Sequence, residues 1–156
     1  MEALINSFLL VFAGEIGDKT QLLALILVAR YKKPWTILGA VFVATLLNHA
    51  LASWIGEWLS SQAAPEALRW GLALTFFVFG VWILFPDKND GLKNESHRGA
   101  FVTTLIAFFL AEMGDKTQLA TVALGARYAS PVLVTVGTTL GMVASNALAI
   151  FLGNAL

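Results

Sequence analysis

The chain carries one stretch of sequence twice. When the chain is shifted by 97 positions, residues Phe12–Pro34 align without a gap on Phe109–Pro131, and 13 of the 23 positions are identical. Each copy contains a run of the form Glu-x-Gly-Asp-Lys-Thr-Gln, which is Glu15–Gln21 in the first copy and Glu112–Gln118 in the second. A repeat at a fixed spacing predicts that the fold is built from two copies of one structural unit.

Long apolar segments surround both copies. Hydrophobic residues make up 58% of the 156 residues and charged residues 13%, whereas soluble domains carry about 25% charged residues. A transmembrane helix needs about 20 predominantly apolar residues. Five segments approach this length, and they cover residues 4–29, 35–58, 70–85, 100–124 and 132–153. The sequence therefore predicts an all-α fold, a polytopic bundle of transmembrane helices.

The composition also excludes some partners and sites. The formal net charge is zero, which gives no electrostatic basis for binding nucleic acid. Cysteine is absent, so disulfides and thiolate metal sites are excluded. The first residues lack the basic region of a cleaved signal peptide, and we expect the first apolar segment to remain in the mature protein.

The repeat divides the chain into two units. The first, residues 1–86, holds three predicted helices, a loop covers residues 87–98, and the second unit, residues 99–156, holds two. Because three is an odd number, the second copy enters the membrane from the opposite side, which makes an inverted repeat. A sixth helix is expected by this symmetry and is missing. Either the chain is truncated after Leu156, or five helices suffice, with a partner such as the second subunit of a homodimer closing the gap.

Basic residues predict the orientation in the membrane, because Lys and Arg of short loops face the cytoplasm. The loops after the first and third helices carry six such residues, against two on the opposite side. The six are Arg30, Lys32, Lys33, Lys88, Lys93 and Arg98, and the two are Arg69 and Arg127. We therefore predict that loop 87–98 is cytoplasmic and that the N-terminus lies outside. The compact length favours a bacterial inner membrane, with a Golgi-type membrane as the alternative.

The acidic runs carry the candidate site. In a continuous helix, Glu15 and Asp18 would project from nearly the same face, as would Glu112 and Asp115. A charged side chain at the bilayer centre costs about 2.5–3.5 kcal/mol on insertion scales, so these acids need a cation, protons or a basic partner. Oxygen ligands suit Ca²⁺, Mg²⁺ or Mn²⁺. The predicted metal ligands are Glu15, Asp18, Gln21, Glu112, Asp115 and Gln118.

Neighbouring residues add to this prediction. Gly17 and Gly114 would let the backbone bend within the runs. Four polar residues at matching positions of the second and fifth helices could complete or orient the site, namely Asn48, His49, Ser145 and Asn146. Four carboxylates and the lysines of the two runs leave a formal charge of −2. One divalent cation or two protons would neutralise this charge, which suggests metal–proton exchange.

The duplicated Glu-x-Gly-Asp-Lys-Thr motif resembles that of the calcium/manganese cation antiporter family, which includes bacterial manganese exporters and Golgi calcium/manganese transporters. The resemblance covers essentially the whole chain. It implies that Glu15, Asp18, Glu112 and Asp115 line the cation path and that transport is coupled to protons. Members of the family resemble six-helix proteins, and this chain departs from them because no sixth helix follows.

The sequence thus predicts a secondary-active exporter of a divalent metal cation, Mn²⁺ first and Ca²⁺ as the alternative, in exchange for protons. The metal is the substrate, no other cofactor is expected, and the bilayer is the remaining partner. A membrane-embedded metal-dependent enzyme is an alternative, but it would need an asymmetry that two nearly identical motifs lack. Another alternative is a scaffold subunit, in which the motifs only pack helices together, Lys19 bonds to Glu15 at i, i+4 spacing, and the buried acids bind no ligand. A third alternative, export of organic cations or amino acids, would want an aromatic-walled or roomier pocket, whereas Phe and Trp are scattered along the helices.

Overall fold

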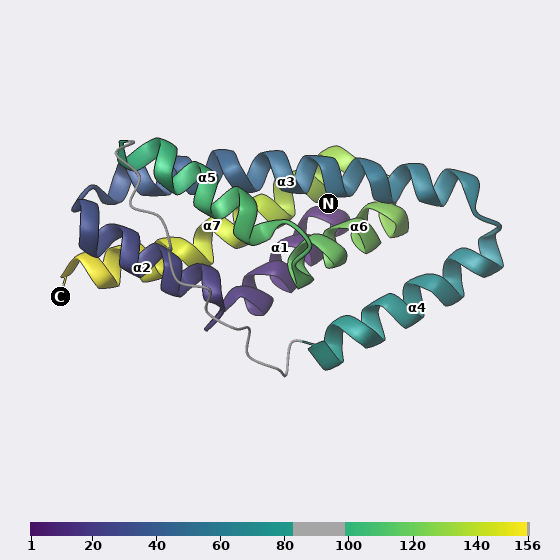
Figure 1. Ribbon diagram of the computed structural model, residues 1–156. Helices are drawn as coiled ribbons and strands as arrows, with labels where there is room; N and C mark the ends of the chain where they lie inside the picture. The colour runs from purple at the N-terminus through teal and green to yellow at the C-terminus, as the bar shows by residue number, and fades with distance from the viewer. Residues whose placement is uncertain (83–98, 156) are drawn as a thin grey trace.

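The computed structural model describes residues 1–82 and 99–155, which form seven helices (Figure 1). The helices are α1 (Glu2–Glu15), α2 (Lys19–Tyr31), α3 (Pro34–Gln62), α4 (Pro65–Trp82), α5 (Ala100–Glu112), α6 (Lys116–Tyr128) and α7 (Pro131–Ala155). The described residues contain no strand, so the predicted all-α class is confirmed. The predicted loop 87–98 lies outside the described residues.

Two of the predicted segments are broken helices. Residues 4–29 are divided between α1 and α2, and residues 100–124 between α5 and α6. The break follows from Gly17 and Gly114, whose φ angles of +80° and +74° lie in the left-handed region, which a right-handed helix cannot contain. The predicted bend is therefore confirmed, whereas the prediction that each motif presents its two acids from one face of a continuous helix is wrong.

Helix boundaries agree between the two repeats. Pro34 begins α3 and Pro131 begins α7, at the first helical position, where the missing N–H of proline has no cost. The preceding helices end on the left-handed residues Lys32 and Ala129, with φ angles of 54° and 45°. The repeated sequence therefore produces a repeated backbone.

The two repeats interlock. α1 packs most extensively against α7, and α3 packs against α5 and α6, so the long helix of each repeat lies against the broken helix of the other. In Figure 1, α1 and α2 run toward the left-hand side, whereas α5 and α6 run from that side toward the right. An inverted repeat requires these opposite directions.

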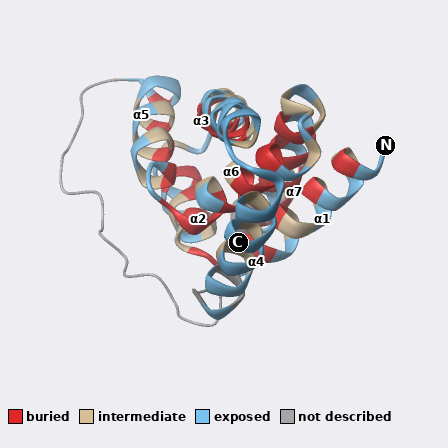
Figure 2. Ribbon diagram, turned by 90° about the vertical axis from the view of Figure 1, so that its right-hand side faces the viewer, coloured by how far each residue is buried: buried red, intermediate tan, exposed pale blue. Residues whose placement is uncertain are grey.

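α4 breaks the symmetry. It packs mainly against α6, and its residues 65–78 are exposed or intermediate (Figure 2). α6 has eight buried residues, whereas its counterpart α2 has four. Within residues 1–82 and 99–155, no helix covers α2 as α4 covers α6. A sixth helix or a partner chain in the corresponding place stays a prediction.

Among residues 1–82 and 99–155, two helical segments are long and apolar enough to cross a membrane, Pro34–Gln62 and Pro131–Leu152, and Ala100–Glu112 is a shorter apolar helix. These two correspond to the second and fifth predicted spans. The first and fourth predicted spans do not satisfy this length individually, because each is divided at its glycine. The polar break therefore shortens the two helices that carry the acids.

The contact between α1 and α7 depends on a glycine. A Cβ atom at Gly141 would lie 2.6 Å from the carbonyl oxygen of Phe8 and 3.0 Å from the backbone nitrogen of Phe12. We expect G141A to lower the free energy of unfolding by about 1–3 kcal/mol, because one backbone must move away from the other. Thermal unfolding of the purified protein in detergent measures the change.

The matched control is G71A in α4, where a Cβ would meet no atom within 4 Å. It should leave stability unchanged or raise it by up to about 1 kcal/mol, since alanine has the better helix propensity. Equal losses in both variants would contradict the importance of the close approach between α1 and α7.

Candidate cation site

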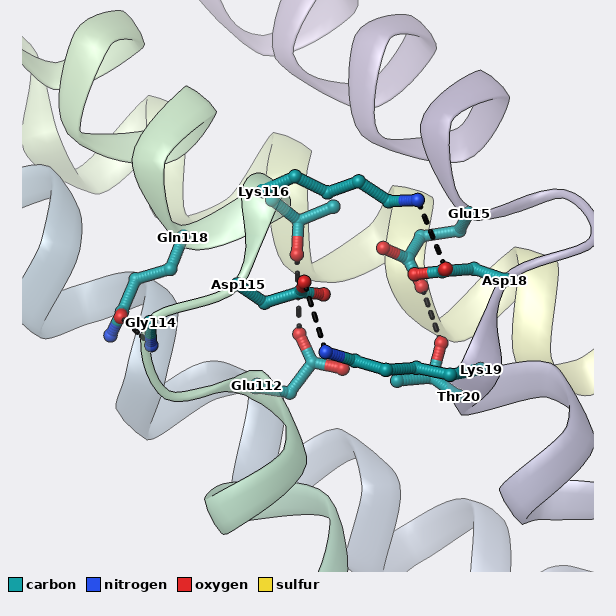
Figure 3. Close-up of polar contacts among 10 residues, drawn as sticks. Glu15, Asp18, Lys19, Thr20, Glu112, Gly114, Asp115, Lys116 and Gln118 are labelled. Carbon is teal, nitrogen blue, oxygen red and sulfur yellow. Dashed lines mark hydrogen bonds and ion pairs between the residues drawn. The ribbon is translucent and has the colours of Figure 1, made fainter. Parts of the chain in front are cut away.

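The two acidic motifs meet inside the bundle (Figure 3). Glu15, Asp18 and Asp115 each contribute one carboxylate oxygen to a group of atoms that lie within 4.8 Å of one another. The three residues are 0%, 6% and 4% exposed. Ca²⁺ and Mg²⁺ bind oxygen at about 2.0–2.6 Å, so ligand atoms on opposite sides of such an ion are roughly 4–5 Å apart. The spacing of these oxygen atoms is therefore compatible with one hard divalent cation between the two repeats.

Glu112 is the fourth carboxylate, and it is 1% exposed. Its Oε2 accepts a hydrogen bond of 3.3 Å from the Thr117 hydroxyl, just as Oε2 of Glu15 accepts one of 2.6 Å from Thr20. The other oxygen of each glutamate, Oε1, is buried and has no hydrogen-bond partner among the described residues. Each glutamate therefore retains one oxygen that can accept a proton or bind a cation.

The helix breaks place the two acids of each motif at opposite helix ends. Glu15 is the last residue of α1, and Asp18 immediately precedes α2. The second motif has the same arrangement, with Glu112 ending α5 and Asp115 preceding α6. The helix dipole stabilises a negative charge at an N-terminus and disfavours one at a C-terminus. Of the four acids, the two glutamates therefore depend most on a neighbouring cation or on a bound proton to offset their negative charge.

The lysine of each motif reaches the aspartate of the other. Nζ of Lys19 lies 3.0 Å from Oδ1 of Asp115, and Nζ of Lys116 lies 3.0 Å from Oδ1 of Asp18. Figure 3 shows the two side chains crossing the site from opposite sides. The packing alternative relied on a Lys19–Glu15 bond at i, i+4 spacing, and the helix break between these residues removes the geometry it assumed. The ion pairs instead join the two repeats.

The glutamine of each motif stabilises the bend through a hydrogen bond with the backbone of the glycine. Oε1 of Gln21 accepts the N–H of Gly17 at 2.9 Å, and Oε1 of Gln118 accepts the N–H of Gly114 at 2.6 Å. The amide of Gln21 also donates to the hydroxyl of Ser145 at 2.7 Å. The predicted ligand role of both glutamines stays a prediction, because the oxygen that would bind metal is engaged here. The hydrogen bond between glycine and glutamine was not predicted from the sequence. The i, i+4 spacing of the two residues in both copies could have indicated it.

The four polar residues of the long helices divide into two groups. The Asn48 amide donates to the carbonyl oxygen of Phe109 at 3.0 Å, and Ser145 accepts the bond from the first motif described above. These two contact the broken helices and can orient the site. Asn146 donates to its own helix, and both ring nitrogens of His49 are buried without a hydrogen-bond partner in the described part of the chain. No described contact connects the latter two with the carboxylates.

A pocket of about 290 Å³ reaches one side of the site. Residues of α3, of α6 and of the bend before α6 line it. They are Ala52, Ile55, Gly114, Asp115, Gln118, Leu119 and Val122. Asp115 is the carboxylate at its wall, so the pocket offers an approach to the site from the side of the second motif.

Alanine at Gly114 should weaken metal binding without disturbing the packing. The left-handed conformation costs an alanine about 1–2 kcal/mol, whereas its Cβ would meet no atom within 4 Å. If the bend relaxes to relieve this strain, Glu112 and Asp115 move apart. We expect G114A to lose up to about tenfold in affinity for a divalent cation, since about 1.4 kcal/mol corresponds to tenfold.

Titration of the purified protein with Mn²⁺ measures this effect. The control is G99A, where a Cβ also meets no atom within 4 Å and φ is −59°. Unchanged affinity in G114A would show that the bend does not position the carboxylates.

Discontinuous helices whose ends meet between two oppositely directed repeats define a class of membrane protein. In secondary transporters, such helix ends form the substrate and coupling-ion sites at the interface of the repeats. The buried carboxylates of this chain lie at that place. The fold and the site thus have the features of an ion-coupled transporter.

The chain belongs to the family described as "Divalent cation/proton antiporter GDT1", whose model matches residues 3–91 and 100–156. It is accordingly an integral membrane protein of the antiporter class, and the resemblance found in the motifs is confirmed.

Relatives of the chain come from bacteria and plants. A Vibrio cholerae protein named "Putative manganese exporter" is 51% identical over 154 residues, which cover 98% of this chain and 77% of the relative. "GDT1-like protein 3" of Arabidopsis thaliana is 28% identical, covering 99% of this chain and 62% of the relative. "GDT1-like protein 2, chloroplastic" of Oryza sativa subsp. japonica is 28% identical, covering 92% and 50%. The chain thus spans less than two thirds of these plant relatives. No solved structure matches it significantly.

Proposed function

We propose that the chain exports a divalent cation from the cytoplasm in exchange for protons, with Mn²⁺ as the first substrate and Ca²⁺ as the alternative. The observation that carries the proposal is the meeting of carboxylates from both repeats in one buried group. The family description and the name of the Vibrio cholerae relative support the same activity. An all-oxygen donor set accommodates either ion.

Charge balance supplies the coupling. Four carboxylates and two lysines carry a formal charge of −2 when all are ionised. Both ammonium groups lie 3.0 Å from a carboxylate oxygen of the site, so their charges count within it. One divalent cation or two protons would bring the site to neutrality, and a neutral site avoids the cost of charge in a low-dielectric interior. The site would bind either one divalent cation or two protons. Alternation between these two bound states exchanges metal for protons.

The metal would bind Glu15, Asp18 and Asp115, with Glu112 supplying or withholding its buried oxygen. The repeats would then move relative to each other around this site, exposing it to one side of the membrane at a time. The pocket beside Asp115 would serve as one route, and the inverted repeat would place the second route on the side of Asp18. The N-terminus lies outside in this proposal, in a bacterial inner membrane.

The geometry favours transport over the enzyme alternative. In both motifs the threonine donates to the glutamate, the glutamine accepts from the glycine, and the lysine reaches the opposite aspartate. A metal-dependent hydrolytic site would need one side that activates water and another that binds substrate. Two sides with the same contacts suit a site that opens in two directions.

Flux through proteoliposomes tests the proposal. The purified chain is reconstituted with an acidic lumen and a neutral bath, and uptake of Mn²⁺ and of Ca²⁺ is measured in parallel. We expect metal to enter as protons leave, and we expect uptake to stop when a protonophore collapses the gradient.

The other outcomes are informative. Uptake of Ca²⁺ alone would change the substrate and keep the mechanism. Metal uptake that persists without a pH gradient would contradict proton exchange. No uptake of either metal by a folded chain would favour the scaffold subunit.

A further inference from the structure

Two ion pairs cross the site in a reciprocal way. Each lysine directly follows the aspartate of its own motif in the sequence but lies 3.0 Å from the aspartate of the other. We propose that Lys19 and Lys116 are tethered cations that occupy the aspartates of the metal-free site and are displaced by the transported metal. This inference rests on the proposed function and adds to it two residues that act on the metal's affinity.

The lysines and the metal compete for the same carboxylates. Asp18 and Asp115 belong to the group whose oxygen atoms could share one cation, and each is also the partner of a lysine. A divalent cation bound there would lie within a few ångströms of two ammonium groups. Like charges repel strongly at such distances in a buried site. Metal binding therefore requires that at least one ammonium group release the aspartate oxygen that it contacts, while its charge stays close enough to offset the remaining carboxylates.

The exchange of one cation for another preserves the interface between the repeats. The Lys19–Asp115 pair joins α2 with the bend before α6, and the Lys116–Asp18 pair joins α6 with the bend before α2. When a metal takes their place, it also joins carboxylates of both repeats. The buried acids are thus neutralised in part before the metal arrives and after it leaves, which lowers the cost of the metal-free state.

The two lysines are not equally free to move. The side chain of Lys19 is 25% exposed, and that of Lys116 is 4% exposed. The helices that carry them also differ, because α4 packs against α6 and has no equivalent on α2 among the described residues. A long lysine side chain can carry its charged end to the surface when a path exists. Lys19 is therefore the lysine that we expect to leave first.

A purely structural role makes the opposite prediction. If the lysines only fasten the motifs in the geometry that metal needs, removing either one disorders the ligands and weakens metal binding. If they compete with the metal, removal strengthens binding and slows release. The sign of the change in affinity separates the two roles.

The test compares Mn²⁺ binding by the full-length purified chain and by K19M, with K33M as a control that removes an exposed lysine at the start of α3. We expect K19M to bind at least about tenfold more tightly, which corresponds to about 1.4 kcal/mol, and to transport more slowly because release is slower. We expect K19R to stay near the original affinity and K33M to match it.

The outcomes distinguish this inference from the proposed function. If the unmodified chain binds no divalent cation, the proposed function fails. If it binds Mn²⁺ and K19M binds equally well or more weakly, only the lysine inference is overturned. Because a substitution in the site can affect folding, a second measurement uses the unmodified protein.

That measurement follows the reaction of lysines with an amine-specific acylating reagent by mass spectrometry, with and without Mn²⁺. Release from its ion pair should raise the labelling rate of Lys19 several-fold when Mn²⁺ binds, while Lys33 reacts at a constant rate. Lys19 labelling that is unchanged or reduced by Mn²⁺ would overturn the inference.

Discussion

Glu15→Gln is expected to abolish exchange and to weaken binding of a divalent cation by more than about 100-fold. The substitution keeps the shape of the side chain, and the amide oxygen can still accept the hydrogen bond that Thr20 donates at 2.6 Å. What is lost is the negative charge and the proton-binding capacity of a fully buried group. Removing one partner of a buried charge pair costs about 3–5 kcal/mol, and about 1.4 kcal/mol corresponds to tenfold.

Glu112→Gln should have a comparable effect, because Glu112 is also buried and also retains an oxygen without a hydrogen-bond partner in the described chain. Titration with Mn²⁺ and proteoliposome flux measure both variants. The matched control is Glu66→Gln, which makes the same change at an exposed position in the first turn of α4. Flux in Glu15→Gln equal to that in Glu66→Gln would remove the glutamates from the cation path.

Asp18→Asn should destabilise the protein more than Asp115→Asn, although the two positions are equivalent in the repeat. Loss of the Asp18 charge removes a carboxylate from Lys116, whose side chain is 4% exposed, and such a change costs about 3–5 kcal/mol. Loss of the Asp115 charge affects Lys19, which is 25% exposed and can turn toward the surface. That loss should lie nearer the cost of about 1 kcal/mol for an exposed ion pair.

Thermal unfolding of the two variants tests this difference, and a double variant shows its cause. Adding Lys116→Met to Asp18→Asn removes both charges, so no unpaired ammonium group remains buried. We expect the double variant to regain most of the lost stability. Equal losses in the two single variants, or no recovery in the double variant, would contradict the account of the asymmetry.

Much of the arrangement could be predicted from the sequence because the repeat is so well preserved. The apolar segments indicated helices, the duplicated acids indicated one site, and an odd number of helices in the repeated unit indicated opposite directions. Gly17 and Gly114 indicated a bend, and both adopt the left-handed conformation. These predictions depend on local pattern and on symmetry, both of which are visible in one chain.

The contacts that cross between the repeats could not be predicted. The i, i+3 and i, i+4 rules assume a continuous helix, and they fail where a left-handed glycine ends one helix and another begins. The position of Lys19 beside Asp115 depends on how α2 approaches the second repeat, which no pattern within either motif specifies. The packing of α4, which belongs to the first repeat, against α6 of the second is likewise a contact that the repeat does not predict.

In the proposed mechanism, the two motifs form one cation site rather than two. Equilibrium titration of the purified chain with Mn²⁺, together with metal analysis of the bound fraction, measures the number of ions that the chain binds. We expect one Mn²⁺ per chain, and we expect Glu15→Gln and Glu112→Gln each to weaken the binding of that single ion by more than about 100-fold. Two ions per chain, with each substitution removing only one of them, would contradict a single shared site.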